Sequence, residues 1–379
     1  MNRHLDSTAA SVLPARPLLP GFFRAIAMGE DEVQLRSAGR VIRLAGPRFG
    51  QIGPRLLSAL DGHRTLADLS AQFALADGAL EQLLRGLHDD GVLIDGAGER
   101  AEGSSNPALA EFLASANRPL DGAYDALHEA RVLVAGLGPV ARMAARSLAA
   151  SGVGTLVLAD PGQVSAVDQA TLPSEPQHAG RPRSRVAAME CMDAAQGAMP
   201  NGTAGPTVVM EGDDPVTALG RAGPLSLVIA EVGEADGGAE TVNEACLSFG
   251  VDAVFHETTP LEALVTTVLA RGPGGCHECQ ANRRASHLRY YDEYVAYRRA
   301  LAAGQISPRQ PAVLGGAAAM AAGMVAMEAL AVLSPGRRAA AGDVVVADFR
   351  SLEVRREALL AVPGCPACRL RPSAGPAGS

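Results

Sequence analysis

The stretch Arg131-Val-Leu-Val-Ala135, followed directly by Gly136-Leu-Gly138-Pro-Val-Ala141, decides the fold of this chain. Its apolar run predicts a strand buried on both faces, and its glycines predict a tight turn that opens a helix. A second apolar run, Thr155-Leu-Val-Leu-Ala159, ends at Asp160, about twenty residues after the turn. Strands that alternate with helices in this way predict a doubly wound, Rossmann-like parallel sheet in an α/β fold.

The glycine turn is a candidate nucleotide site. Gly136 and Gly138 would let the backbone approach a phosphate, whose charge a helix N-terminus favours. Asp160 is placed to accept hydrogen bonds from ribose hydroxyls. Glycine-rich turns of this kind also occur where nothing binds, so a purely structural turn remains the alternative.

Composition excludes several classes of protein. The 379 residues carry a formal charge of −8 with a pI near 5.5, which argues against a general nucleic-acid binder. All 33 basic side chains are arginine, so the chain has no P-loop, Schiff-base or kinase lysine. The first residues lack the apolar run of a secretory signal, and we therefore expect a cytoplasmic protein with reduced thiols.

One segment, Ala312–Leu333, is almost wholly apolar and long enough to span a membrane. It consists mostly of Ala, Gly and Met, and Glu328 lies inside it, where a charge would be costly in lipid. We expect a buried helix of a soluble core and no membrane association, with a spanning helix as the alternative.

Two cysteine pairs give the most specific signal in the sequence. Cys276-His-Glu-Cys279 and Cys365-Pro-Ala-Cys368 each lie in a turn rich in Gly and Pro. Four thiolates in two such turns predict a closed, structural zinc site that ties the end of the chain to the domain. The redox alternative for a single pair needs a thioredoxin-like setting, which the sequence lacks. Cys191 and Cys246 are expected in the core.

Residues 19–96 predict a small winged-helix module. Three strand-like runs are separated by turn-forming residues: Phe22–Met28, Val33–Arg36 and Arg40–Leu44. Helical periodicity follows from Ile52 to Leu87, with Thr65 as a cap, and a last strand is expected at Val92–Ile94. Winged helices often bind DNA, but no helix here is dense in arginine.

The chain is therefore expected to have four segments. Residues 1–18 form a flexible tail, 19–96 the winged-helix module, 97–125 a linker rich in Gly and Ser, and 126–379 the α/β domain.

The region from Arg131 to Arg185, the two cysteine pairs and the late Ala-rich helix resemble the ubiquitin-activating-like adenylyltransferase family of the ThiF/MoeB type. The resemblance implies the zinc site and an ATP site in which Arg, Lys and Asp side chains hold phosphates and magnesium. Here the segment 164–172 has no Arg, Arg183 stands where the family has Lys, and Glu231-Val-Gly-Glu234 replaces the usual Asp. No cysteine for a family-type thioester lies between Ala281 and Pro311. These departures argue against adenylation and leave ATP binding in doubt.

Four further segments extend the resemblance: Leu18-Leu-Pro20, Asp61-Gly-His-Arg-Thr65, Gly342-Asp-Val-Val-Val-Ala-Asp348 and Pro363-Gly-Cys-Pro-Ala-Cys368. They are similar to proteins of ribosomal peptide (RiPP) pathways that carry a precursor-peptide recognition element and assist a YcaO-type cyclodehydratase. Such pathways make thiazole and oxazole natural products, including thiopeptides and bacteriocins. The resemblance implies that a leader peptide adds beside the third strand, next to the third helix. The residues implied here are Arg40, Val41, Ile42, Arg43, Leu44, Gln82 and Arg85. A solvated face is the alternative for these arginines.

We therefore expect a non-catalytic scaffold that binds a precursor leader peptide and presents it to a YcaO-type cyclodehydratase. It would contain structural zinc, would bind no nucleic acid, and could form a homodimer. An active adenylating enzyme that acts on a peptide or carrier-protein C-terminus is the alternative, and a DNA-binding regulator is a third reading.

Overall fold

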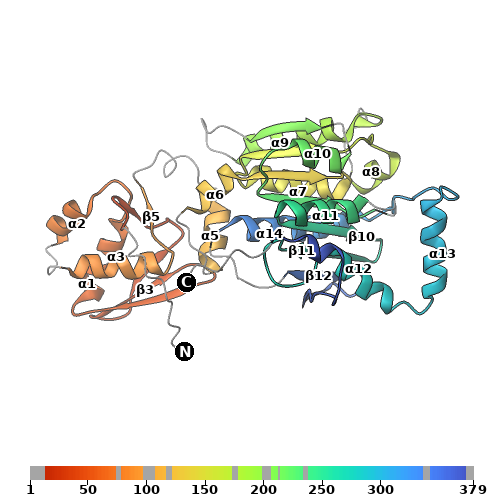
Figure 1. Ribbon diagram of the computed structural model, residues 1–379. Coiled ribbons are helices and arrows are strands. Elements are labelled where there is room, and N and C mark those ends of the chain that lie inside the picture. The colour runs from red at the N-terminus through yellow and green to blue at the C-terminus, as the bar shows by residue number, and fades with distance from the viewer. Residues whose placement is uncertain are drawn as a thin grey trace. The chain divides into compact units, whose positions relative to one another are not determined.

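The computed structural model describes residues 13–73, 78–96, 107–116, 122–172, 178–198, 206–211, 214–233, 238–335 and 342–372. The described chain divides into two compact units, one up to Ala126 and one from Leu127 onward (Figure 1). Part of the predicted tail and linker, and Glu234, lie outside the described residues.

The first unit is built on a three-stranded antiparallel sheet of order β2-β3-β4. Its elements are β1 (Pro17–Leu18), β2 (Arg24–Ala27), β3 (Glu32–Arg36), β4 (Val41–Ala45), α1 (Phe49–Ser58), α2 (Leu66–Phe73), α3 (Ala79–Asp89), β5 (Ile94–Asp95) and α5 (Pro107–Ser115). Val33 and Leu35 of β3 are fully buried, as are Leu84 and Leu87 of α3. Strands followed by three helices and a short last strand agree with the winged-helix prediction.

Two details of that prediction need correction. Pro17–Leu18 pairs with β5, so ordered structure begins within the predicted tail. Residues Pro107–Ser115 form helix α5, so the predicted linker contains a helix. Local chemistry was predicted better: the Thr65 Oγ1 accepts from the Asp68 amide, and the Asp68 carboxylate accepts from the Thr65 amide. This reciprocal cap fixes the start of α2.

The second unit contains an eight-stranded sheet of order β13-β12-β11-β10-β9-β6-β7-β8. Its strands are β6 (Arg131–Ala135), β7 (Thr155–Ala159), β8 (Thr207–Glu211), β9 (Leu227–Glu231), β10 (Ala253–Thr258), β11 (Glu262–Val268), β12 (Asp343–Asp348) and β13 (Glu353–Ala358). The neighbours from β10 to β8 are parallel, which confirms the predicted α/β sheet. From β10 to β13 the pairing is antiparallel.

Helices cover this sheet in two groups (Figure 1). In one group, α9 (Arg183–Ala198) and α14 (Gly315–Leu333) pack against α7 (Pro139–Ala150). In the other, three helices pack against α11 (Gly238–Phe249): α10 (Pro215–Arg221), α12 (His277–Ser286) and the short 3₁₀ helix η2 (Ala367–Leu370). The remaining helices are α6 (Ala123–Glu129), α8 (Ala166–Thr171) and α13 (Tyr291–Ala302).

Helix α14 is the predicted Ala-rich segment, and within the described residues it alone is long and apolar enough to cross a membrane. It packs against α7 and against strands β9, β10 and β11, with Ala318, Ala322 and Val325 buried. Glu328 is also buried, and its carboxylate accepts hydrogen bonds from Thr267 Oγ1 and from the guanidinium of Arg356. Both the packing and the ion pair agree with the predicted core helix.

Candidate functional site

The glycine turn lies at the carboxyl end of β6, where the strand order changes direction. Strand β6 has β7 on one side and β9 on the other, so the next strand in sequence and a much later one both border the turn. Such switch points are where open α/β sheets bind ligands. Gly136 has a φ of 82°, a conformation that favours glycine, and Gly138 is the N-cap of α7. The structure thus places the turn as predicted.

Both amide groups of the turn already have carboxylate partners. The Leu137 N–H donates to Asp160 Oδ2 at 2.6 Å, and the Gly138 N–H donates to Glu231 Oε2 at 2.9 Å. Asp160 Oδ1 accepts in addition from the Gly162 N–H at 2.6 Å. Asp160 is therefore buried and bonded to backbone groups on both oxygens.

Arg183 lies at the start of α9 and faces acidic groups. Its Nε and Nη2 donate to the two oxygens of Asp168 at 3.0 and 3.1 Å, and its Nη1 lies 3.5 Å from Asp160 Oδ2. Gln310 joins the pair, since its Oε1 accepts from Arg183 at 2.9 Å and its Nε2 donates to Asp168 at 2.7 Å. Burial opposes the charge of Arg183, but Asp168 and Asp160 outweigh it and raise the pKa of Arg183. Ser165 is the N-cap of α8, and Asp168 completes the capping box by accepting from the Ser165 N–H.

The residues at this edge do not fit the phosphates of ATP. The amides that a phosphate would use are bonded to Asp160 and Glu231, and the guanidinium of Arg183 is bonded to Asp168 and Gln310. One cation faces three carboxylates, so further negative charge would be repelled. Burial raises the pKa of Glu231, which the bond from Gly138 and the charge of Arg183 partly offset.

The four cysteines of the two predicted pairs meet in one cluster. The Sγ atoms of Cys276 and Cys279 are 3.8 Å apart, those of Cys276 and Cys365 3.8 Å, and those of Cys279 and Cys368 3.5 Å. A tetrahedral ion with Zn–S bonds of about 2.3 Å places its sulfur atoms about 3.8 Å apart. The cluster therefore has the dimensions of a four-thiolate zinc site, and zinc there would be structural because no ligand position is left for substrate.

Local structure brings the cysteines together. Cys276 is the N-cap of α12 and Cys279 lies in its first turn, where the helix dipole favours thiolate. The Val362 N–H donates to the Cys279 Sγ at 3.3 Å. The guanidinium of Arg371 donates to the carbonyl oxygens of Gly272, Gly274 and Gly275 at 2.8–3.0 Å, which clamps the first cysteine turn to the end of the described chain.

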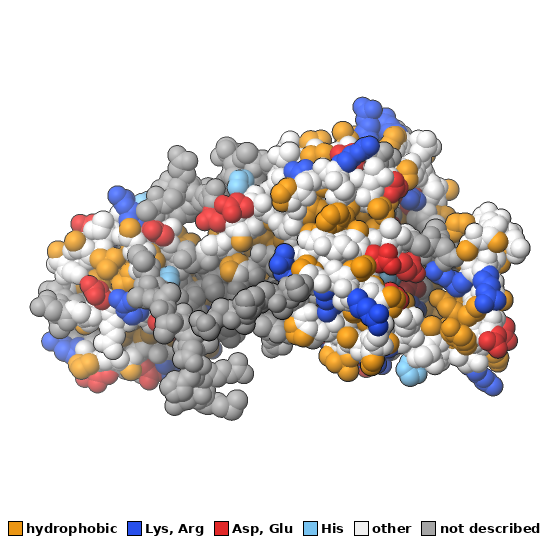
Figure 2. Space-filling view, in the orientation of Figure 1, with side chains coloured by type: hydrophobic (Ala, Val, Ile, Leu, Met, Phe, Trp, Pro, Cys, Tyr) orange, Lys and Arg blue, Asp and Glu red, His pale blue; other side chains and the backbone are white. Residues whose placement is uncertain are grey.

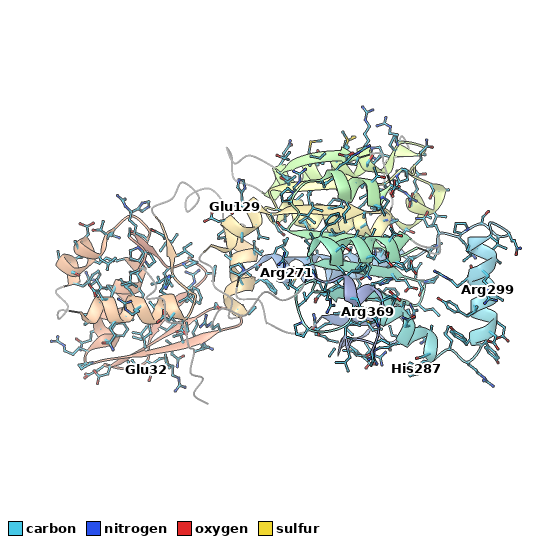
Figure 3. All side chains as sticks on the ribbon, viewed as in Figure 1. Glu32, Glu129, Arg271, His287, Arg299 and Arg369 are labelled. Atoms are coloured by element: carbon cyan, nitrogen blue, oxygen red, sulfur yellow. The ribbon has the colours of Figure 1, made fainter. Side chains whose placement is uncertain are left out.

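In the first unit, the predicted peptide-binding residues occupy an edge strand and an exposed helix face. Strand β4 is at the edge of its sheet, and Gln82 and Arg85 of α3 are exposed. Arg43 is 74% exposed and lies 3.9 Å from Glu32, which Figure 3 labels on this sheet. Arg40 differs, because its side chain is 13% exposed and its guanidinium is bonded to Asp90.

The two motifs of the predicted recognition element also meet. Leu18 and Asp61 form an isolated β-bridge, the Leu19 N–H donates to the Leu60 carbonyl oxygen at 2.8 Å, and the Gly62 N–H donates to that of Pro17 at 3.1 Å. The first strand is thereby held beside the turn that precedes α2.

With this geometry in hand, comparisons identify the family. The sequence profile of the ThiF family matches residues 113–367. The chain belongs to the ThiF family. Comparison with curated proteins finds no sequence match.

The ThiF-family fold extends to solved structures. The E. coli MccB structure with succinimide superposes with a TM-score of 0.66 at 14% identity, covering 94% of this chain and 99% of MccB. The microcin C7 biosynthetic enzyme MccB in complex with N-formylated MccA gives a TM-score of 0.64 at 14% identity, covering 93% and 99%. PaaA gives 0.61 at 14% identity, covering 90% and 99%. At this identity the likeness establishes the fold.

Sequence reasoning missed three contributors to these ThiF-family sites. Glu231 was noted only as a replacement, although its place at the carboxyl end of a parallel strand would have put it beside the glycine turn. Gln310 and Arg371 gave no signal, because each acts through contacts with residues 96 to 145 positions away in sequence, for which no local pattern exists.

Proposed function

We propose that this ThiF-family chain is a scaffold that binds the leader of a ribosomal precursor peptide and presents the peptide to a YcaO-type cyclodehydratase. The observation that carries the proposal is the open edge of β4, whose preceding residue Arg40 is bonded to Asp90 at the end of α3. Among the described residues, β4 pairs only with β3. An extended peptide can add to such an edge through backbone hydrogen bonds.

The hydrogen-bond register indicates which residues offer backbone groups to a peptide. The Ser37 N–H donates to the Arg40 carbonyl oxygen at 2.9 Å, so this opposed pair is hydrogen-bonded. Antiparallel pairs alternate, so Ile42, opposite Leu35, also bonds to β3, whereas Arg43, opposite Gln34, does not. The N–H and C=O groups of Val41 and Arg43 are therefore directed to the open edge, and those of Ile42 are not.

Exposed side chains of β4 and of α3 favour an acidic leader. Arg43 on β4 and Arg85 on α3 are both exposed, and Val41 is 49% exposed. Basic side chains around an apolar strand suit a peptide with alternating acidic and apolar residues. On the face seen in Figure 2, basic and acidic side chains are interspersed without a continuous basic surface, which speaks against the DNA-binding alternative.

The solved structures of MccB support the proposal by similarity, since they include complexes of that enzyme with MccA. For this chain, however, the filled glycine turn speaks against the adenylating alternative. ATP–pyrophosphate exchange separates the two readings, and we expect none.

The decisive test is fluorescence polarisation of a labelled cognate leader with the full chain. We expect an affinity near the micromolar range. Arg43→Pro removes one outward N–H and should weaken binding about tenfold or more, while Arg85→Glu should weaken binding of an acidic leader.

A matched control lies on the opposite edge of the same sheet. The Met28 N–H donates to the Glu32 carbonyl oxygen at 2.8 Å. Antiparallel pairs alternate, so the preceding residue Ala27, the last of β2, directs its N–H to the outer edge of the sheet. Ala27→Pro should leave leader affinity unchanged. Equal loss in both proline variants, or full affinity in Arg43→Pro, would refute binding at β4.

A further inference from the structure

The side chain of Glu231 fills the space that the missing side chains of the glycine turn leave open. A Cβ placed on Gly138 would lie 2.4 Å from Glu231 Oε1 and 2.7 Å from Oε2. A Cβ placed on Gly136 would lie 2.9 Å from the Glu231 Cβ. In a nucleotide-binding turn, glycines leave this space so that a phosphate can approach the backbone. Here a carboxylate from the same chain lies in it.

The position suits an anion, and Glu231 supplies one. Gly138 is the N-cap of α7, a helix of 12 residues whose dipole favours negative charge at this end, and its N–H donates to Glu231. Strand β9 ends at Glu231, next to β6 in the sheet, so the backbone holds this side chain directly beside the turn. No rearrangement of the strand is needed to keep the carboxylate in place.

The surrounding residues hold the arrangement closed. Arg183, whose charge acts on Glu231, is bonded to Asp168 and to Gln310. Gln310 belongs to the segment between α13 and α14, so this segment is also tied to the edge of the sheet. A phosphate entering the turn would have to displace Glu231 and would face Asp160 and Asp168 as well.

We infer that Glu231 is a built-in occupant of the anion position of the glycine turn, and that the ThiF-family domain of this chain excludes nucleotide phosphates for that reason. The inference goes beyond leader binding, because it assigns a state to the second unit that is independent of the peptide. It also predicts that a single substitution restores anion binding to the turn.

The test measures binding of magnesium pyrophosphate, and of ATP with magnesium, by isothermal titration calorimetry and thermal shift. Wild-type protein should show no binding at millimolar ligand. Glu231→Ala should bind pyrophosphate at least about tenfold more tightly, because its amides become available. Glu211→Ala is the matched control, since Glu211 ends the parallel strand β8 of the same sheet, and it should behave as wild type.

Each outcome decides the inference. Wild-type binding as tight as that of Glu231→Ala would overturn it, and so would a folded Glu231→Ala that binds neither ligand. If Glu231→Ala does not fold, Glu231→Ser also shortens the side chain and removes its charge, and it should still bind pyrophosphate more tightly than wild type. Leader affinity should be unchanged in every variant, so a failure here is distinguishable from a failure of the proposed function.

Discussion

Arg40 ties the start of β4 to the end of α3 through Asp90. Its Nη1 donates to the Asp90 backbone carbonyl oxygen at 2.7 Å, and its Nη2 lies 3.3 Å from Asp90 Oδ1. Asp90 is the C-cap of α3, so the guanidinium donates to a carbonyl oxygen at the helix end. Its positive charge there also interacts favourably with the helix dipole. Arg40 is thus a structural contact beside the proposed leader surface.

This contact predicts unequal effects of two substitutions. Arg40→Ala loses both interactions and should lower the free energy of unfolding by about 1–1.5 kcal/mol. Asp90→Ala keeps the backbone carbonyl and loses only an ion pair whose acid is 48% exposed, so solvent screening should limit the loss to about 0.5 kcal/mol or less. Urea unfolding of the full chain measures both. Equal losses would show that the carboxylate, and not the helix end, is the important partner.

Metal removal tests the cysteine cluster. We expect one zinc ion per chain by elemental analysis, and Cys276→Ser or Cys368→Ser should lose zinc and lower the unfolding temperature, because structural metal binding stabilises the fold. Cys191→Ala removes a buried thiol outside the cluster and should retain zinc. Folded wild-type protein that contains no metal would contradict the prediction.

His256 predicts an acid-sensitive component of stability. It is 1% exposed, and neither ring nitrogen has a hydrogen-bond partner within the described structure. Burial lowers the pKa of His256 from 6.5 to about 4. Below pH 6.5 the unfolded chain binds a proton that the folded chain does not, so the stability present above pH 6.5 is lost as the pH falls toward 4.

Replacing His256 should remove this pH dependence. In wild-type protein His256 should lower the free energy of unfolding by up to about 3 kcal/mol as the pH falls from 6.5 to about 4, and His256→Leu should abolish this decrease. At neutral pH the variant should be no less stable than wild type. His287→Leu is the control, because His287 is exposed at the end of α12 (Figure 3). An unchanged slope in His256→Leu would mean that other groups cause the acid response.

The ion pair of Glu328 with Arg356 predicts strong coupling. Arg356→Met leaves a buried carboxylate whose remaining hydrogen-bond partner among the described residues is Thr267. It should cost about 1–3 kcal/mol, a range that allows for the 50% exposure of Arg356. The double variant Glu328→Leu/Arg356→Met removes both charges and should recover most of that loss. A double-mutant cycle measured by urea unfolding checks this, and additive losses would contradict it.

Much of the fold was predictable because its signals are local. The apolar runs at β6 and β7 matched the observed strands residue for residue, and the leucine spacing of α3 gave its buried face. The cysteine cluster was predictable from the two cysteine pairs, because cysteines at that spacing have few other roles. Long-range contacts were not predictable in this way: Glu231 with Gly138, Gln310 with Asp168 and Arg371 with Gly275 join residues 93 to 142 positions apart. Strand β13, exposed along its whole length, gave no apolar pattern.

The cysteine cluster also has a consequence for chain topology. Cys276 and Cys365 are 89 residues apart, so a metal that binds both would close a ring containing α12, α13, α14, β12 and β13. Cross-linking a loop of that size reduces the conformational freedom of the unfolded chain by about 4–5 kcal/mol in loop-entropy models. A chelator would open this ring without breaking a covalent bond, and the last two strands of the sheet, which contain no cysteine, would lose stability together with the cluster.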